Sequence, residues 1–236
     1  MLFKTLTSLF FPKTCACCRT VIDENESFCD YCYSMLEPCD CTKLCLKCGH
    51  DKKFCVCKNR VFHFDLAAAP YYNTGIARKA FYSFKFNRNE ALAIVFARQM
   101  ALTLRQVYSD ENFDFITFVP MSKSRERKLG YNPVLLLAER LSDLVDIPVK
   151  DVLKCHKKKR PQHKLKDYKK RFDNVAGIYY TDKRLSSKRI LLIDDIKTTG
   201  ATLDECAKQL YSAGADRVCC LTALMTSRKR GKKNVG

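Results

Sequence analysis

The sequence lacks long apolar runs and a recognisable secretion signal. No stretch approaches the roughly 18 consecutive apolar residues that a membrane-spanning helix needs. Near the start, residues 5–11 form a short uncharged stretch that ends at Pro12 and has no small-residue cleavage site. These absences argue against an integral membrane protein and a secreted one. They predict a cytoplasmic protein.

Acidic residues are also scarce. There are 25 Asp and Glu against 43 Lys and Arg, which gives a formal net charge of +18. Hydrophobic residues make up 47% of the chain and charged residues 29%, as in a folded globular protein rather than a disordered one. The 236 residues suffice for one domain of about 150 to 200 residues and a smaller unit. The charge favours polyanionic partners, which include nucleic acid, phosphorylated small molecules and anionic lipid.

Cysteine is abundant but unevenly placed, because eleven of the 15 cysteines fall within residues 15–57. In a reducing compartment, clustered cysteines usually hold metal instead of forming disulfides. Three CxxC pairs and one CxC pair provide eight thiolates, enough for two tetrahedral structural zinc sites with no open position. In sequence order, the ligands would be Cys15, Cys18, Cys29 and Cys32 for the first site and Cys45, Cys48, Cys55 and Cys57 for the second. An interleaved pairing is the alternative. The remaining Cys17, Cys39 and Cys41 are expected to be free thiols, although Cys39 and Cys41 could compete for a site.

The composition changes after residue 60, where strand and helix patterns begin to alternate. Apolar runs predict strands at residues 65–72, 113–119, 148–153, 176–180, 189–193 and 217–225. Helical periodicity predicts helices at 75–86, 90–108, 133–144 and 203–213. This alternation is typical of an α/β fold with a mostly parallel sheet and helices on both faces. We therefore expect a zinc ribbon module at 1–60, an α/β domain at 61–227 and a basic, disordered tail at 228–236.

The most specific motif is RILLIDDIKTTGAT at residues 189–202. Its apolar strand brings Asp194 and Asp195 to the carboxyl edge of a parallel sheet, where open α/β folds bind ligands. The loop of small residues that follows opens a helix, and its backbone N–H groups can hold a phosphate. Together they suit a sugar phosphate, with the two acids on the ribose hydroxyls. The phosphate-side candidates are Lys197, Thr198, Thr199, Gly200, Ala201 and Thr202.

This motif resembles the phosphoribosyl pyrophosphate motif of type I phosphoribosyltransferases. Together with the zinc ribbons, the stretch at 119–132 and the basic segment at 162–174, the whole chain resembles the ComF family of competence-associated proteins. The resemblance implies a type I phosphoribosyltransferase-like domain that binds phosphoribosyl pyrophosphate with Mg²⁺, and a mobile flap at 160–174. It places the pyrophosphate loop at Pro120, Met121, Ser122 and Lys123, with Arg125 and Arg127 close by. Pro133 stands where the family commonly has Gln, so no role of that Gln is carried over.

The resemblance also implies a role in DNA uptake and natural transformation, with single-stranded DNA and a helicase-like competence ATPase as partners. Residues 150–189 hold fifteen basic and four acidic residues, interleaved with Tyr168, Phe172, Tyr179 and Tyr180, as single-strand binding requires. The nucleic-acid candidates are Lys157, Lys158, Lys159, Arg160, Lys169, Lys170 and Arg171.

Whether the domain is an enzyme stays open at the level of sequence. Asp194 and Asp195 are the catalytic candidates, since they could stabilise positive charge on the ribose as pyrophosphate leaves. None of the four histidines has an acid at a recognisable spacing, and no segment for selecting a base is evident. The alternatives to a competence adaptor are an active phosphoribosyltransferase of nucleotide salvage and a zinc scaffold with a vestigial pocket.

Overall fold

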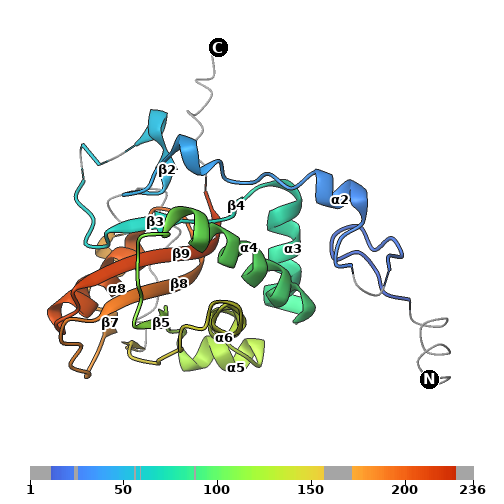
Figure 1. The fold of residues 1–236 in the computed structure, drawn as a ribbon. Coiled ribbons are helices and arrows are strands. Elements are labelled where there is room, and N and C mark those ends of the chain that lie inside the picture. Colours follow the sequence, from blue (N-terminus) through green and yellow to red (C-terminus); the bar gives the residue numbers. More distant parts are fainter. Residues whose placement is uncertain are drawn as a thin grey trace, which may run out of the picture.

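The central sheet is parallel throughout. The structure is a computed structural model that describes residues 12–23, 26–55, 57–58, 60–87, 89–156 and 172–226. The strands of the sheet are β3 (Leu66–Ala68), β4 (Tyr71–Tyr72), β5 (Phe115–Phe118), β8 (Arg189–Lys197) and β9 (Arg217–Met225) (Figure 1). Their order is β3-β9-β8-β5, with β4 also paired to β9, and each of these pairs is parallel. The two longest strands, β8 and β9, lie in the middle of the sheet.

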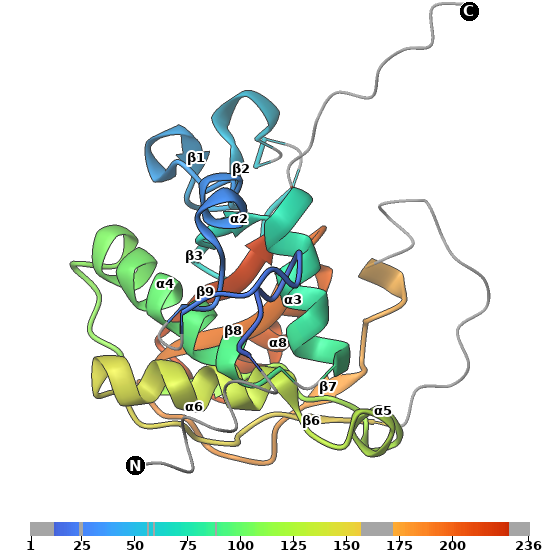
Figure 2. The same cartoon turned by 90° about the vertical axis from the view of Figure 1, so that its right-hand side faces the viewer.

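Helices cover both faces of this sheet (Figure 2). Along β8, Leu191 and Ile193 pack in one buried cluster with side chains of three helices, and Ile190 and Leu192 pack on the opposite face with the fourth. The three helices are α3 (Gly75–Asn87), α4 (Ala91–Val107) and α6 (Pro133–Val145), and the fourth is α8 (Ala201–Ser212). Because both faces are covered, β8 and β9 read as nearly continuous apolar runs. The predicted fold class is confirmed.

The starts of two helices follow from local chemistry. The Asn132 side chain accepts hydrogen bonds from the backbone N–H groups of Val134 and Leu135, and Pro133 occupies the first turn, where its missing N–H costs nothing. At the start of α8, Gly200 has φ 83°, a left-handed conformation that a residue with a Cβ adopts only at a cost. None of the helices among the described residues has the length and apolar character that crossing a bilayer requires.

Some predicted strands differ from the observed ones. The strand predicted at 148–153 is wrong, because Val149 makes only a single parallel bridge to Ile116 of β5. The chain instead forms β6 (Lys154–Cys155), which pairs antiparallel with β7 (Tyr179–Tyr180) outside the main sheet. The strand predicted at 65–72 is divided into β3 and β4 around Pro70, which has no N–H to donate to a sheet ladder. The strand predicted to end at residue 193 continues to 197, since its pairing with β9 extends that far.

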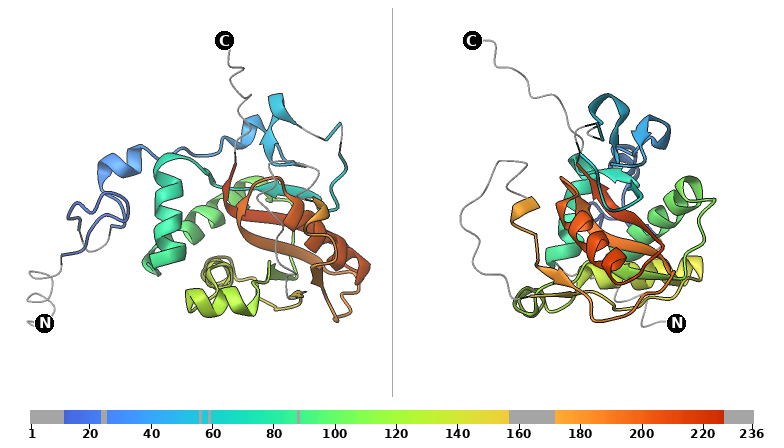
Figure 3. Two further views of the ribbon diagram at one scale, coloured as in Figure 1. Left: turned by 180° about the vertical axis from the view of Figure 1, so that it is seen from behind. Right: turned by 90° about the vertical axis from the view of Figure 1, so that its left-hand side faces the viewer.

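The cysteine-rich segment occupies two places on the α/β unit (Figures 1 and 3). Its first part contains α2 (Asp30–Ser34) and lies beside α3. Its second part contains η1 (Cys41–Lys43), β1 (Leu44–Cys45), β2 (His50–Asp51) and η2 (Lys52–Phe54). This second part packs on the sheet, because the Ala67 N–H donates to the Leu46 carbonyl at 2.7 Å and Leu44 shares a buried cluster with Met225 of β9.

Candidate functional site

The two acids at the end of β8 lie close to a lysine from α3. Asp194 is buried, and its Oδ1 accepts the backbone N–H of Asp195 at 2.8 Å. Asp195 Oδ1 accepts the N–H of Ile196 at 2.6 Å, and its Oδ2 forms an ion pair with the Lys85 ammonium. Lys85 is itself buried. The site is therefore a cluster of two carboxyl groups and one ammonium at the carboxyl edge of the sheet.

The charges in this cluster are unequal. Burial raises the pKa of Asp194 well above its usual range, the neighbouring charge of Asp195 raises it further, and Lys85 only partly opposes the shift. Asp194 is therefore harder to ionise than an exposed aspartic acid, whereas Asp195 faces an ammonium. Two neighbouring carboxyl groups offer oxygen atoms to which adjacent hydroxyl groups of a sugar can donate.

Sequence reasoning missed Lys85. A signal was available, because Lys85 follows Phe84 and lies four residues after Phe81, and both of these aromatic side chains are fully buried. A lysine on the apolar face of a helix needs a partner for its charge. The sequence alone could not name that partner, since Asp195 lies 110 residues away.

The predicted phosphate loop closes a short turn beside the acids. β8 ends at Lys197 and α8 begins at Ala201, so only residues 198–200 connect them. The Thr199 hydroxyl accepts the N–H of Ala201 at 3.3 Å, which tightens this turn. The first N–H groups of α8 point out of the helix here, where the helix dipole favours an anion. The candidates from 197 to 202 therefore lie in one turn next to Asp194 and Asp195.

Residues from the segment before β3 pack against Lys197 and against the turn that precedes α8. Lys197 is buried, and a Cβ placed on Gly49 would lie 3.4 Å from its Cε and 3.0 Å from the Ala67 carbonyl oxygen. Gly49 has φ 66°, so only glycine fits this approach without strain. A Cβ on Gly200 would likewise lie 3.4 Å from the Phe62 ring. The segment around the second cysteine group thus packs directly beneath the loop.

The predicted pyrophosphate loop leads into a helix that the sequence analysis did not predict, α5 (Lys123–Leu129). β5 and β8 are parallel neighbours, so residues 120–125 follow β5 at the same edge of the sheet as Asp194. A cleft of about 590 Å³ separates the start of α5 from the β6–β7 hairpin. Its lining includes Ser122, Lys123 and Arg127, but not Pro120, Met121 or Arg125.

Tyr179 of β7 packs against the buried cluster on the α8 side of the sheet. Its side chain is mostly buried, and burial raises its pKa above the usual range. The predicted sugar and pyrophosphate subsites follow the neighbouring parallel strands β8 and β5, and that they form one site remains a prediction.

One histidine has an acid partner that sequence reasoning did not find. The His63 Nδ1 lies 3.2 Å from Asp204 Oδ1 in the first turn of α8, and the same oxygen accepts the His63 backbone N–H at 2.6 Å. The sequence analysis found no acid at a recognisable spacing from any histidine, and this pair has no such spacing. The 141 residues between the two partners explain why no spacing revealed them.

The predicted nucleic-acid track is largely outside the described residues, because Lys157, Lys158, Lys159, Arg160, Lys169, Lys170 and Arg171 all fall there, as do Tyr168, most of the expected flap and the basic tail. The described aromatic residues of that track are partly covered. The Phe172 ring has the Arg60 guanidinium 3.0 Å from its centroid, and Tyr180 stacks on His156 with centroids 4.2 Å apart. Tyr179 is partly buried against the cluster on the α8 side of the sheet.

The eight predicted metal ligands form two separate groups. Within each group, the sulfur atoms all lie within 4.8 Å of one another, and the members follow sequence order as Cys15, Cys18, Cys29 and Cys32, then Cys45, Cys48, Cys55 and Cys57. These are the two groups that the sequential pairing predicts. Four thiolates at such separations are a donor set that fits a tetrahedral structural zinc ion. Cys17, Cys39 and Cys41 belong to neither group.

Known proteins were compared with the sequence and the fold. No family model matches the sequence. A competence protein ComFC from Streptococcus pneumoniae is 29% identical over 92% of this chain and 90% of its own length. The chain thus resembles the ComF proteins. The ComFC protein of Bacillus subtilis is 31% identical over 56% of this chain, and competence protein F of Haemophilus influenzae is 29% identical over 57%. These two alignments span only 52% and 62% of the respective relatives.

Solved structures with a similar arrangement include two that carry phosphoribosyl names. The glutamine phosphoribosylpyrophosphate amidotransferase of Bacillus subtilis gives a TM-score of 0.41 at 16% identity, covering 61% of this chain and 30% of that one. The purine phosphoribosyltransferase of Pyrococcus horikoshii gives 0.35 at 19% identity, covering 56% and 84%. Both scores lie below 0.5, so the parallel sheet described above, and not these likenesses, defines the fold of this ComF-like chain.

Proposed function

We propose that this chain is a ComF-type protein of DNA uptake that binds phosphoribosyl pyrophosphate at the edge of its sheet. The observation that carries this proposal is the buried cluster of Asp194, Asp195 and Lys85 next to the short turn that opens α8. A sugar esterified with phosphate has both hydroxyl groups, which suit the acids, and an anionic end, which suits the start of a helix. The similarity to competence proteins supplies the biological setting.

Each part of the ligand has a matching group. The ribose hydroxyls would donate to carboxyl oxygens of Asp194 and Asp195. The 5′-phosphate would accept N–H groups from residues 198–202, at the start of α8. The pyrophosphate would lie toward Ser122 and Lys123, which line the cleft at the start of α5.

Magnesium would be held mainly by the ligand. Mg²⁺ prefers charged oxygen ligands and keeps several of its waters. Here Asp194 is buried and Asp195 is paired with an ammonium, so the acids do not form a ready protein site for the ion. Ribose and pyrophosphate oxygens with water would complete the coordination. The two cysteine groups are proposed as structural zinc sites, and they keep no position open for chemistry.

The pocket is tested by calorimetry with phosphoribosyl pyrophosphate and Mg²⁺. We expect the wild type to bind and the double variant Asp194→Asn, Asp195→Asn to lose most of its affinity. Asp110→Asn, which changes an exposed acid after α4, serves as the control and should bind normally. Unchanged affinity in the double variant would reject the ligand assignment.

The competence role needs two further measurements. Single-stranded DNA binding should weaken with salt and weaken again when Lys157, Lys158, Lys159 and Arg160 are changed to Ala. The partner is proposed to be a helicase-like competence ATPase. Release of pyrophosphate with any member of a nucleobase panel would favour a salvage phosphoribosyltransferase over an adaptor, since an adaptor binds the ligand without consuming it.

A further inference from the structure

A groove separates the first cysteine group from the outer face of α3. It has a volume of about 420 Å³ and is lined by residues of both segments, among them Arg19, Lys79, Tyr82 and Phe86. The two segments lie side by side in each view (Figures 1 and 2). The groove is separate from the acid cluster and from the cleft at α5, and nothing in the proposed function uses it.

Two aromatic rings form one wall of this groove. Tyr82 and Phe86 are four residues apart, which places them on the same face of α3. Their ring centroids are 5.5 Å apart, and 41% and 51% of these residues remain exposed. The other face of α3 buries Phe81 and Phe84 completely, so the helix does not need the outer rings for its own core.

Positive charge surrounds these rings. The Arg78 guanidinium lies 5.4 Å from the Tyr82 ring centroid, and Lys79 and Arg19 line the groove directly. No acidic residue is among the lining residues, and within the described part of the chain neither Lys79 nor Arg19 forms an ion pair. Exposed aromatic rings flanked by cations that have no carboxylate partner match the chemistry of a base next to a phosphate.

The groove is next to the proposed sugar phosphate pocket. Lys85, which pairs with Asp195 on the inner side of α3, has its ammonium 5.8 Å from the Phe86 ring centroid. A strand lying along the outer face of α3 would therefore pass within one helical turn of the acid cluster.

We propose that this groove binds single-stranded nucleic acid, with bases stacked on Tyr82 and Phe86 and phosphates held by Arg19 and Lys79. A protein partner fits less well, because the polar Ser83 and Asn87 interrupt the apolar surface between and beside the rings. The proposal rests on the DNA-binding part of the proposed function and gives it a site among the described residues.

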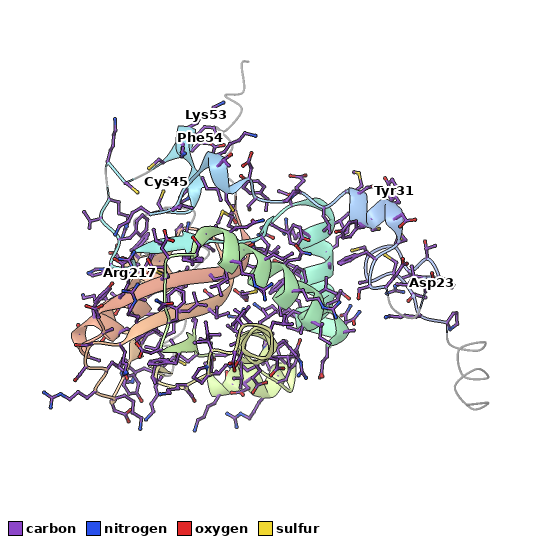
Figure 4. All side chains as sticks on the ribbon, in the orientation of Figure 1. Asp23, Tyr31, Cys45, Lys53, Phe54 and Arg217 are labelled. Atoms are coloured by element: carbon purple, nitrogen blue, oxygen red, sulfur yellow. The ribbon has the colours of Figure 1, made fainter. Side chains whose placement is uncertain are left out.

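Stacking can be measured directly, because the chain contains no tryptophan. Tyr82→Trp places a single fluorophore in the groove, and Tyr31→Trp places one on α2, where Tyr31 is 69% exposed outside the groove (Figure 4). A thymine oligonucleotide should quench the emission of the Tyr82→Trp protein and leave that of the Tyr31→Trp protein nearly unchanged. An abasic oligonucleotide of equal length should not quench either. Equal responses from the two proteins, or from the two oligonucleotides, would overturn the proposal.

Affinity gives the second readout. Changing both Tyr82 and Phe86 to Ala should weaken oligonucleotide binding roughly tenfold or more, as expected for lost stacking. Tyr31→Ala should have no such effect. Lys79→Ala should reduce the slope of log affinity against log salt concentration by about the amount that one phosphate contact contributes. Lys208→Ala, on α8 at the opposite face of the sheet, should leave that slope unchanged.

The result also separates this proposal from the wider one. If the wild type binds oligonucleotide and the Tyr82→Ala, Phe86→Ala protein binds equally well, only the groove is wrong. If the wild type does not bind at all, the DNA-binding part of the proposed function fails with it. Calorimetry of the same double variant with phosphoribosyl pyrophosphate checks that α3 and the adjacent pocket are intact.

Discussion

The ion pair between Lys85 and Asp195 is expected to stabilise the protein and to organise its pocket. Lys85→Met removes the ammonium but keeps an apolar stem of similar length, and Asp195→Asn removes the carboxylate. The two side chains are 9% and 18% exposed, so the pair is intermediate between two known cases. Exposed ion pairs contribute up to about 1 kcal/mol, and breaking a buried one costs about 3–5 kcal/mol. We therefore expect either single change to lower the free energy of unfolding by about 2–3 kcal/mol.

A double-mutant cycle tests this directly. Urea unfolding is measured for the wild type, both single variants and the double variant Lys85→Met, Asp195→Asn. The coupling energy should be about 1–3 kcal/mol, because once one partner is removed, removing the other breaks no further ion pair. Lys208→Met, an exposed lysine on α8, is the matched control and should change little. If the two single effects simply add in the double variant, the ion pair does not hold the site together.

Three other predictions concern single residues. Burial raises the pKa of Asp194 when the chain folds, so its contribution to stability is lost as pH rises above about 4, the unfolded value. Between pH 5 and pH 8, the melting temperature of Asp194→Asn should therefore rise relative to that of the wild type. A difference in melting temperature that does not change with pH would contradict the assignment. Metal analysis should find two zinc ions in the wild type and in Cys17→Ser but one in Cys18→Ser; equal contents in the two variants would disprove the ligand set. Gly49→Ala should cost about 1–2 kcal/mol in thermal unfolding, because the backbone is left-handed there and the added Cβ would lie 3.0 Å from the Ala67 carbonyl oxygen; an unchanged stability would argue against this close approach.

Features encoded within a short stretch of sequence could be predicted. The strand predicted at 217–225 matches β9, because a buried parallel strand is a continuous apolar run between turn residues. The helices at 75–86, 90–108 and 133–144 were found within a residue or so at each end from their periodicity. The two cysteine groups followed from pairs with metal-ligand spacing that occur in order along the chain.

Features that depend on distant partners could not be predicted. The contacts of Lys85 with Asp195 and of His63 with Asp204 join residues more than a hundred positions apart, and no periodicity records them. Helix α5 was missed for a different reason. None of its residues is buried, so it has no apolar stripe from which a helix could be recognised. The segment at 148–153 has the composition of a strand, but the sequence does not show that the chain turns away to pair with β7.

The packing of Leu44 against Met225 has a consequence for how the protein is made. Synthesis proceeds from the N-terminus, so the second cysteine group leaves the ribosome long before the last strand, β9, on which it rests. Contacts between such distant parts of a chain form late and slowly in folding. A newly made chain therefore contains the thiols of the second cysteine group before it contains the strand that supports them.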